Sequence, residues 1–148
     1  MIFDKVSSDI VAAMKAKDKV RLMALRTVKK YFIEAKTAPG ANDELTDEEA
    51  TKILAKLAKQ GRDTAEIYVG QSRKDLADEE LAQVAVIEEY LPKQLSADEL
   101  KAELQAIIAQ VGAQGPQDMG KVMGKATKVL VGRAEGKAIS AMVRELLA

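Results

Sequence analysis

The sequence of 148 residues predicts an all-α protein, with a four-helix N-terminal domain followed by a three-helix C-terminal domain. Three observations support this fold class. Apolar residues recur at helical spacing along the chain, and no segment shows the period-two alternation that is typical of a strand. Glycine and proline are confined to a few joints, while the remaining positions are rich in Ala, Leu, Lys, Glu and Gln, which favour helices.

The first two helices are expected at residues 2–16 and 18–36. One side of the first carries Val6, Ile10, Val11 and Met14. Asp18 is the expected N-cap of the second helix, because its carboxylate can accept a hydrogen bond from a free amide of the first turn. Pro39 and Gly40 then require a loop.

The third helix is expected to begin with a capping box formed by Thr46 and Glu49. In this motif the Thr46 hydroxyl accepts a hydrogen bond from the Glu49 amide, and the Glu49 carboxylate accepts one from the Thr46 amide. The third helix is expected to end between residues 68 and 70, and its predicted inward residues are Ile53, Leu54, Leu57 and Ala58. The fourth is expected from about 74 to 90, with Leu81, Val84, Ala85 and Ile87 inward. Pro92 disfavours helical geometry at Leu91 and is therefore expected to end the fourth helix.

A second capping box, Ser96 with Glu99, begins a fifth helix that is expected to end near Val111. A break at residues 112–116 precedes a sixth helix to 131 and a seventh over 134–147. Pro92 followed by a new capping box indicates a boundary, so we expect domains at 1–93 and 94–148. Six of the nine glycines lie beyond it: Gly112, Gly115, Gly120, Gly124, Gly132 and Gly136.

The composition excludes several kinds of active site. The chain has no His and no Cys, so it can form neither a Ser-His-Asp triad, nor a Cys nucleophile, nor a Cys/His zinc site. We expect no catalytic residues, no metal and no cofactor. Any acid–base chemistry would need a strongly perturbed Asp, Glu or Lys. Residues 115–121 have the spacing of a phosphate-binding loop, but Val122 replaces the Ser or Thr that would hold magnesium, which favours a simple turn into a helix.

The charges are segregated although they sum to zero, with 23 basic and 23 acidic residues. Residues 15–36 hold eight bases against two acids, a local +6, and residues 75–89 hold six acids and no base, a local −6. Residues 119–144 hold six bases against one acid, a local +5. Neutrality is therefore a cancellation of blocks and says little about local binding of polyanions.

Two basic stripes follow from helical spacing. Lys121, Lys125 and Lys128 share one side of the sixth helix, while the inward positions are Met119, Val122, Ala126, Val129 and Leu130. Lys19, Arg26 and Lys30 form a similar stripe on the second helix. Both stripes fit two interpretations at this point. Each is either a solvated face whose charge balances that of the acidic residues 75–89, or a surface that binds a polyanion.

Two glycine pairs, Gly120 with Gly124 and Gly132 with Gly136, accompany the C-terminal basic residues. Each pair permits close approach, either by a neighbouring helix or by a phosphate backbone. Aromatic residues are only 3 % of the chain, so contacts to nucleic acid would involve backbone and shape, with no reading of DNA sequence. The N-terminus lacks the features of a signal peptide and no apolar stretch could span a bilayer, so a cytoplasmic location is expected.

Two C-terminal motifs resemble the signature of the YqeY family. They are Asp118-Met119-Gly120-Lys121-Val122-Met123-Gly124 and Gly132-Arg133-Ala134-Glu135-Gly136-Lys137. The likeness extends upstream through Leu25-Arg26, Lys59-Gln60-Gly61-Arg62, residues 70–76, and Tyr90-Leu91-Pro92 with Gln94-Leu95-Ser96. Two positions depart from the family pattern: Glu135, where Asp is expected, and Gly61, where Arg or Lys is usual.

This family is similar to the tail domain of the B subunit of glutamyl/aspartyl-tRNA amidotransferase (GatB), and the resemblance implies a helical N-terminal domain joined to a tail domain that faces tRNA. The resemblance implies no activity for this chain. A family-level description as a glutamine-dependent carbon–nitrogen ligase would come from the domain that the family shares with the amidotransferase. The expected RNA contacts are Lys121, Lys125, Lys128, Arg133, Lys137, Gly120, Gly124, Gly132 and Gly136, with Lys19, Arg26 and Lys30 as a second basic face. An adaptor for an amidotransferase or a synthetase is the alternative, and an amide-forming enzyme is a third hypothesis.

Overall fold

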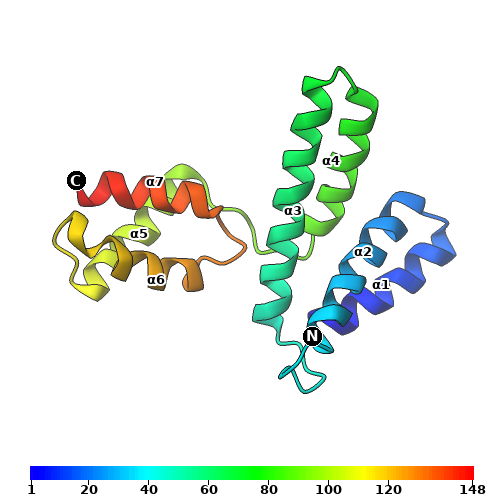
Figure 1. The fold of residues 1–148 in the computed structure, drawn as a ribbon, viewed down its shortest axis with the longest axis horizontal. Helices are drawn as coiled ribbons and strands as arrows, with labels where there is room; N and C mark the ends of the chain where they lie inside the picture. The colour runs from blue at the N-terminus through cyan, green and yellow to red at the C-terminus, as the bar shows by residue number, and fades with distance from the viewer. The chain divides into compact units, whose positions relative to one another are not determined.

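The computed structural model describes all 148 residues and is entirely helical, with seven α-helices, one short 3₁₀ helix and no strand (Figure 1). The all-α prediction is confirmed. Contacts within the chain divide it into two compact units, residues 1–91 and 92–148, and each has its own hydrophobic core. The predicted assignment of two domains at 1–93 and 94–148 stays a prediction.

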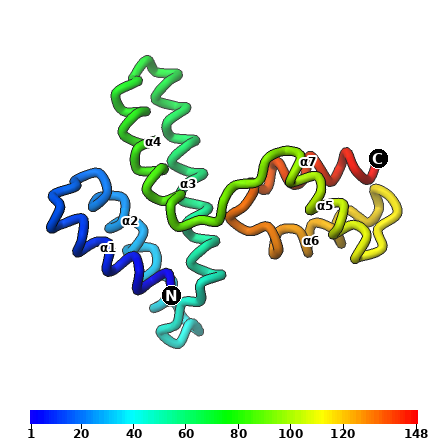
Figure 2. The backbone as a smooth tube through the Cα atoms, turned by 180° about the vertical axis from the view of Figure 1, so that it is seen from behind, coloured from blue at the N-terminus to red at the C-terminus, as the bar shows by residue number.

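The first unit consists of two helical hairpins. Helices α1 (Ile2–Ala16) and α2 (Lys19–Lys36) form one hairpin, and α3 (Asp47–Gly70) and α4 (Lys74–Glu88) form the other. Helix α2 packs against α1 on one side and against α4 on the other, as Figures 1 and 2 show from opposite directions. The fully buried side chains Phe32, Leu25, Leu54, Val6 and Val28 form the centre of this core, and the rings of Phe3 and Tyr90 pack against it.

Local sequence fixes where these helices begin. Asp18 caps α2 by accepting from the Arg21 amide at 3.1 Å, and Thr46 caps α3 by accepting from the Glu49 amide at 3.1 Å. The predicted capping box at Thr46 is only half formed: the Thr46 side chain accepts from the Glu49 amide, but the Glu49 carboxylate accepts no hydrogen bond from the Thr46 amide. Helix α4 ends at Glu88, two residues before the predicted end.

Several residues that helical spacing assigns to an apolar side in the first unit are exposed. Val11 is 49 % exposed, Met14 52 % and Leu81 45 %, and Ala85 is also exposed. Helical periodicity identifies the apolar side of a helix, but that side is buried only where a neighbouring helix covers it. Helix α1 packs mainly on α2, so the outer edge of its apolar side is left uncovered. The outer side of α4 is uncovered in the same way.

Gly61 sets the distance between α3 and α4. A Cβ atom at this position would overlap Cγ2 of Val84, a buried and rotationally stiff side chain of α4. The departure from the family pattern at Gly61 thus has a structural reason, because the two helices approach closely here. Tyr90 packs against the core of this unit, and its hydroxyl donates to the Asp9 carboxylate. Burial and this hydrogen bond raise the pKa of Tyr90.

The second unit is a three-helix bundle of α5 (Ala97–Val111), α6 (Met119–Val129) and α7 (Gly136–Leu147), with the 3₁₀ helix Pro116–Asp118 before α6. Both halves of the capping box at Ser96 are formed, and hydrogen bonds from Ser96 lower the pKa of Glu99. Helix α6 ends two residues before, and α7 begins two residues after, the predicted bounds. The fully buried Leu104, Val122, Leu130 and Val143 form its core.

We expect Gly61→Ala to destabilise the protein, although alanine is the better helix former by about 1 kcal/mol. The added methyl group overlaps Val84, so α3 and α4 must separate, and overpacking of this kind costs about 1–3 kcal/mol. Chemical denaturation followed by circular dichroism measures the difference. The double variant Gly61→Ala/Val84→Ala is the control: removal of the Val84 methyl groups should relieve part of the clash, and a purely additive loss would contradict this account.

Candidate nucleic-acid interface

Helix α6 has one buried side and one basic side. Val122, Ala126 and Leu130 are fully buried and face α5 and α7. Since successive residues are about 100° apart, Lys121, Lys125 and Lys128 lie on the side opposite to this buried row. All three lysines are exposed. Val129, predicted to be inward, is 47 % exposed, and Met123 packs on the core instead.

None of the three lysines forms an ion pair. The ammonium group of Lys125 donates to the side-chain carbonyl of Gln110 on α5, which is neutral, and Lys121 and Lys128 have no acidic partner within the chain. The positive charge of this stripe is therefore not neutralised internally. By contrast, two carboxylates of the acidic block on α4 are paired, Glu89 with Arg21 at 2.7 Å and Glu88 with Arg62 at 3.3 Å. The hydrogen bond to Glu89 raises the pKa of Arg21.

Gly120 and Gly124 lie beside the lysine stripe on the same outer side of α6. A Cβ atom at either position would have no atom within 4 Å, and the same holds for Gly136 in the first turn of α7. The close packing of a neighbouring helix, which is the usual reason for helical glycine, is therefore absent at these three positions. They leave bare, accessible backbone next to the unpaired lysines.

The remaining predicted contacts are placed differently. Gly132 is buried, has a φ of +76° and accepts a hydrogen bond from Gln94 on its carbonyl, so it serves the turn between α6 and α7. Arg133 is half-buried, with its guanidinium 3.9 Å from the Glu103 carboxylate and its carbonyl bonded to the Leu95 amide. Lys137 is exposed in the first turn of α7. The accessible part of the predicted set is thus the three lysines of α6, Lys137, and the exposed glycines Gly120, Gly124 and Gly136.

The second basic stripe lies on α2 of the first unit. Lys19, Arg26 and Lys30 are all exposed, as predicted from their spacing, and Lys30 lies 5.6 Å from the ring centre of Tyr31. This stripe borders apolar side chains rather than bare backbone, because Arg26 and Lys30 line a depression together with Ile10 and Ile33. Its chemistry therefore differs from that of α6.

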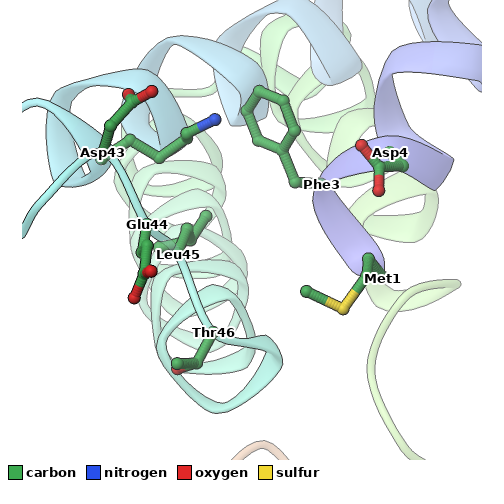
Figure 3. Close-up of a pocket in the computed structure, with 8 residues that line it drawn as sticks. Met1, Phe3, Asp4, Asp43, Glu44, Leu45 and Thr46 are labelled. Carbon is green, nitrogen blue, oxygen red and sulfur yellow. The ribbon is translucent and has the colours of Figure 1, made fainter.

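Three other features bear on metal or ligand binding. No group of three acidic side chains is placed to hold a metal ion. A depression of about 370 Å³ lies where the start of α1 meets the loop before α3. Figure 3 shows its lining residues, among them Asp4, Asp43 and Glu44. The Lys36 ammonium lies 4.3 Å from the ring centre of Phe3, so the aromatic face of this depression already carries a cation. The phosphate-loop spacing at residues 115–121 forms the 3₁₀ turn into α6, with no strand before it.

Comparison with known proteins assigns the chain to a family. The sequence profile described as "Yqey-like protein" matches residues 3–147, nearly the whole length. The chain belongs to this family. It is also 25 % identical over 150 aligned positions to altered inheritance of mitochondria protein 41, mitochondrial, from Pyrenophora tritici-repentis; the match covers 99 % of this chain and 81 % of the fungal protein. No helix combines the length and apolar character needed to span a membrane.

We expect Gly124→Ala to stabilise the protein by about 0.4–1 kcal/mol, because the new methyl group meets no other atom and alanine favours the helix. This is the opposite sign to Gly61→Ala. Chemical denaturation of the two single variants under identical conditions gives the comparison. A loss of stability for Gly124→Ala would show that the glycine is needed for folding, and would remove the argument that it is kept for an external contact.

Proposed function

We propose that this YqeY-family protein binds tRNA or a similarly structured RNA through helix α6 and performs no catalysis of its own. The observation that carries the proposal is the row of exposed, unpaired lysines Lys121, Lys125 and Lys128 beside the bare backbone of Gly120 and Gly124. Lysine ammonium groups bind phosphate oxygens, and a glycine surface lets a ribose-phosphate backbone approach the helix closely. Lys137 extends the positive surface at the start of α7.

Further support comes from the C-terminal motifs, whose resemblance to the YqeY family implies a similarity to the tail domain of the amidotransferase B subunit. That resemblance implies a domain that holds tRNA and does not itself perform chemistry. A cytoplasmic location is part of this proposal. The printed name of the fungal relative attaches a mitochondrial location to that protein. An adaptor for an amidotransferase or a synthetase is the competing function, and it predicts a protein partner that survives nuclease treatment.

Gel shift with tRNA across a salt series tests the proposal. If about three phosphates are neutralised, the slope of log K against log salt should be about −2 to −3. The variant Lys121→Glu/Lys125→Glu/Lys128→Glu should bind at least about tenfold more weakly at low salt and show a shallower slope. The matched control is Lys56→Glu/Lys74→Glu/Lys101→Glu, which changes the net charge equally at exposed positions outside α6. Equal losses in the two variants, or no binding by the wild type at low salt, would contradict the proposal.

Gly124→Ala separates binding from stability. A methyl group on the outer side of α6 holds the RNA backbone farther from the helix, so we expect weaker tRNA binding from a protein that is more stable than the wild type. The same gel shift, at the salt concentration where the wild type is half-bound, measures the effect. Unchanged affinity would place the RNA elsewhere on the protein.

A further inference from the structure

Lys121, Gly124 and Lys128 follow one another along the exposed side of α6. With a rise of about 1.5 Å per residue, the two lysines are about 10 Å apart along the helix axis and point within about 20° of the same direction. Gly124 lies between them, within about 60° of both directions. Neither lysine has an acidic partner within the chain, so this side of α6 presents two cations with bare helix between them.

Gly124 leaves the main-chain carbonyl of Gly120 uncovered. In an α-helix the Cα–Cβ bond tilts toward the N-terminus, so a side chain at position 124 would lie over the carbonyl of residue 120. No other atom takes this place, since a Cβ atom at Gly124 would have no atom within 4 Å. Two neighbouring side chains are directed elsewhere: Met123 packs on the core, and the Thr127 hydroxyl donates to the Met123 carbonyl at 2.8 Å.

The chemistry of the Gly120 carbonyl limits what can bind between the lysines. A carbonyl oxygen in a helix accepts one hydrogen bond from the amide four residues later and keeps a second lone pair for another donor. The oxygen is an acceptor only, so it repels a phosphate oxygen and requires a hydrogen-bond donor. A ligand that matches this surface therefore has an anionic group at each lysine and a donor between the two anions.

The RNA backbone contains these groups in this order, and the DNA backbone lacks one of them. Each ribose lies between two phosphates and has a 2′-hydroxyl that can donate a hydrogen bond, whereas deoxyribose has no hydroxyl at this position. Base stacking cannot contribute on this surface, because residues 92–148 contain no aromatic side chain. The sugar is therefore the place where α6 can distinguish the two nucleic acids.

We propose that α6 selects RNA over DNA by accepting a hydrogen bond from a ribose 2′-hydroxyl on the Gly120 carbonyl, while Lys121 and Lys128 bind the phosphates on either side. This selection rests on the proposed function, because it concerns how the same surface recognises its ligand. Gly124 determines the specificity, since any side chain at this position covers the acceptor. Gly120 contributes only a carbonyl, which any residue would supply.

Fluorescence anisotropy with one RNA stem-loop in three chemical forms tests the proposal: unmodified RNA, the same sequence with 2′-fluoro ribose, and the same sequence as DNA. Fluorine preserves the A-form helix but cannot donate a hydrogen bond. We expect unmodified RNA to bind about two- to tenfold more tightly than the 2′-fluoro form, the range for one hydrogen bond, and DNA to bind no better than the 2′-fluoro form. Equal affinities for RNA and 2′-fluoro RNA would overturn the selection and leave RNA binding standing, whereas no binding of any form at low salt would contradict the proposed function as well.

Two alanine variants provide matched controls, because a Cβ atom at either glycine would meet no other atom. Gly124→Ala covers the Gly120 carbonyl, so the ratio of RNA affinity to 2′-fluoro RNA affinity should fall to about one. Gly120→Ala places its methyl group over the turn before α6 instead, so the ratio should stay at the wild-type value. Circular dichroism checks that both variants are folded. A ratio that is unchanged in Gly124→Ala, or that is lost equally in Gly120→Ala, would overturn the proposal.

Discussion

The packing of Val122, Ala126 and Leu130 against α5 and α7 fixes the direction in which the lysines of α6 point. These three residues recur every four positions, and their burial is the main source of stability available to a helix of eleven residues, which would be marginal in isolation. Once this side is inward, Lys121, Lys125 and Lys128 must be outward. The core of the second unit thereby directs the basic surface outward, and of the three lysines only Lys125 makes a side-chain hydrogen bond, to Gln110 on α5.

The same aliphatic packing explains how a chain that is neutral overall presents polarised surfaces. Each unit folds around a mainly aliphatic core that contains no charged residue, so the charged side chains lie on the outer sides of the helices, where the sequence groups them in blocks of one sign. Arg21 and Arg62 neutralise the end of the acidic block at Glu89 and Glu88. The lysines of α6 have no such partner, and neither do the basic residues of the stripe on α2. What distinguishes α6 is the bare backbone of Gly120 and Gly124 beside its lysines.

Much of the fold could be predicted from the sequence, and the limits have physical causes. Helix starts were predicted at Asp18, Thr46 and Ser96, because a cap is a local interaction between residues three apart. The ends of α4 and α6 were less well predicted, since they depend on neighbouring elements.

Exposure of Val11, Met14 and Leu81 could not be foreseen from periodicity, which marks an apolar side without showing whether anything covers it. The contact between Gly61 and Val84 joins two helices and leaves no local signal. The lysine stripe was predictable from spacing alone. The burial of Gly132 and the partial burial of Arg133 were not, because they depend on the conformation of the turn between α6 and α7.

Titration of ¹⁵N-labelled protein with tRNA, followed by amide chemical shifts, tests most directly whether α6 is the RNA surface. The account predicts that the amides of Gly120, Lys121, Gly124, Lys125 and Lys128 shift first and furthest, while those of Met14, Ile33 and Asp78 do not follow the same binding curve. Shifts concentrated on α1 and α2, or an absence of shifts on α6 at saturating RNA, would contradict it.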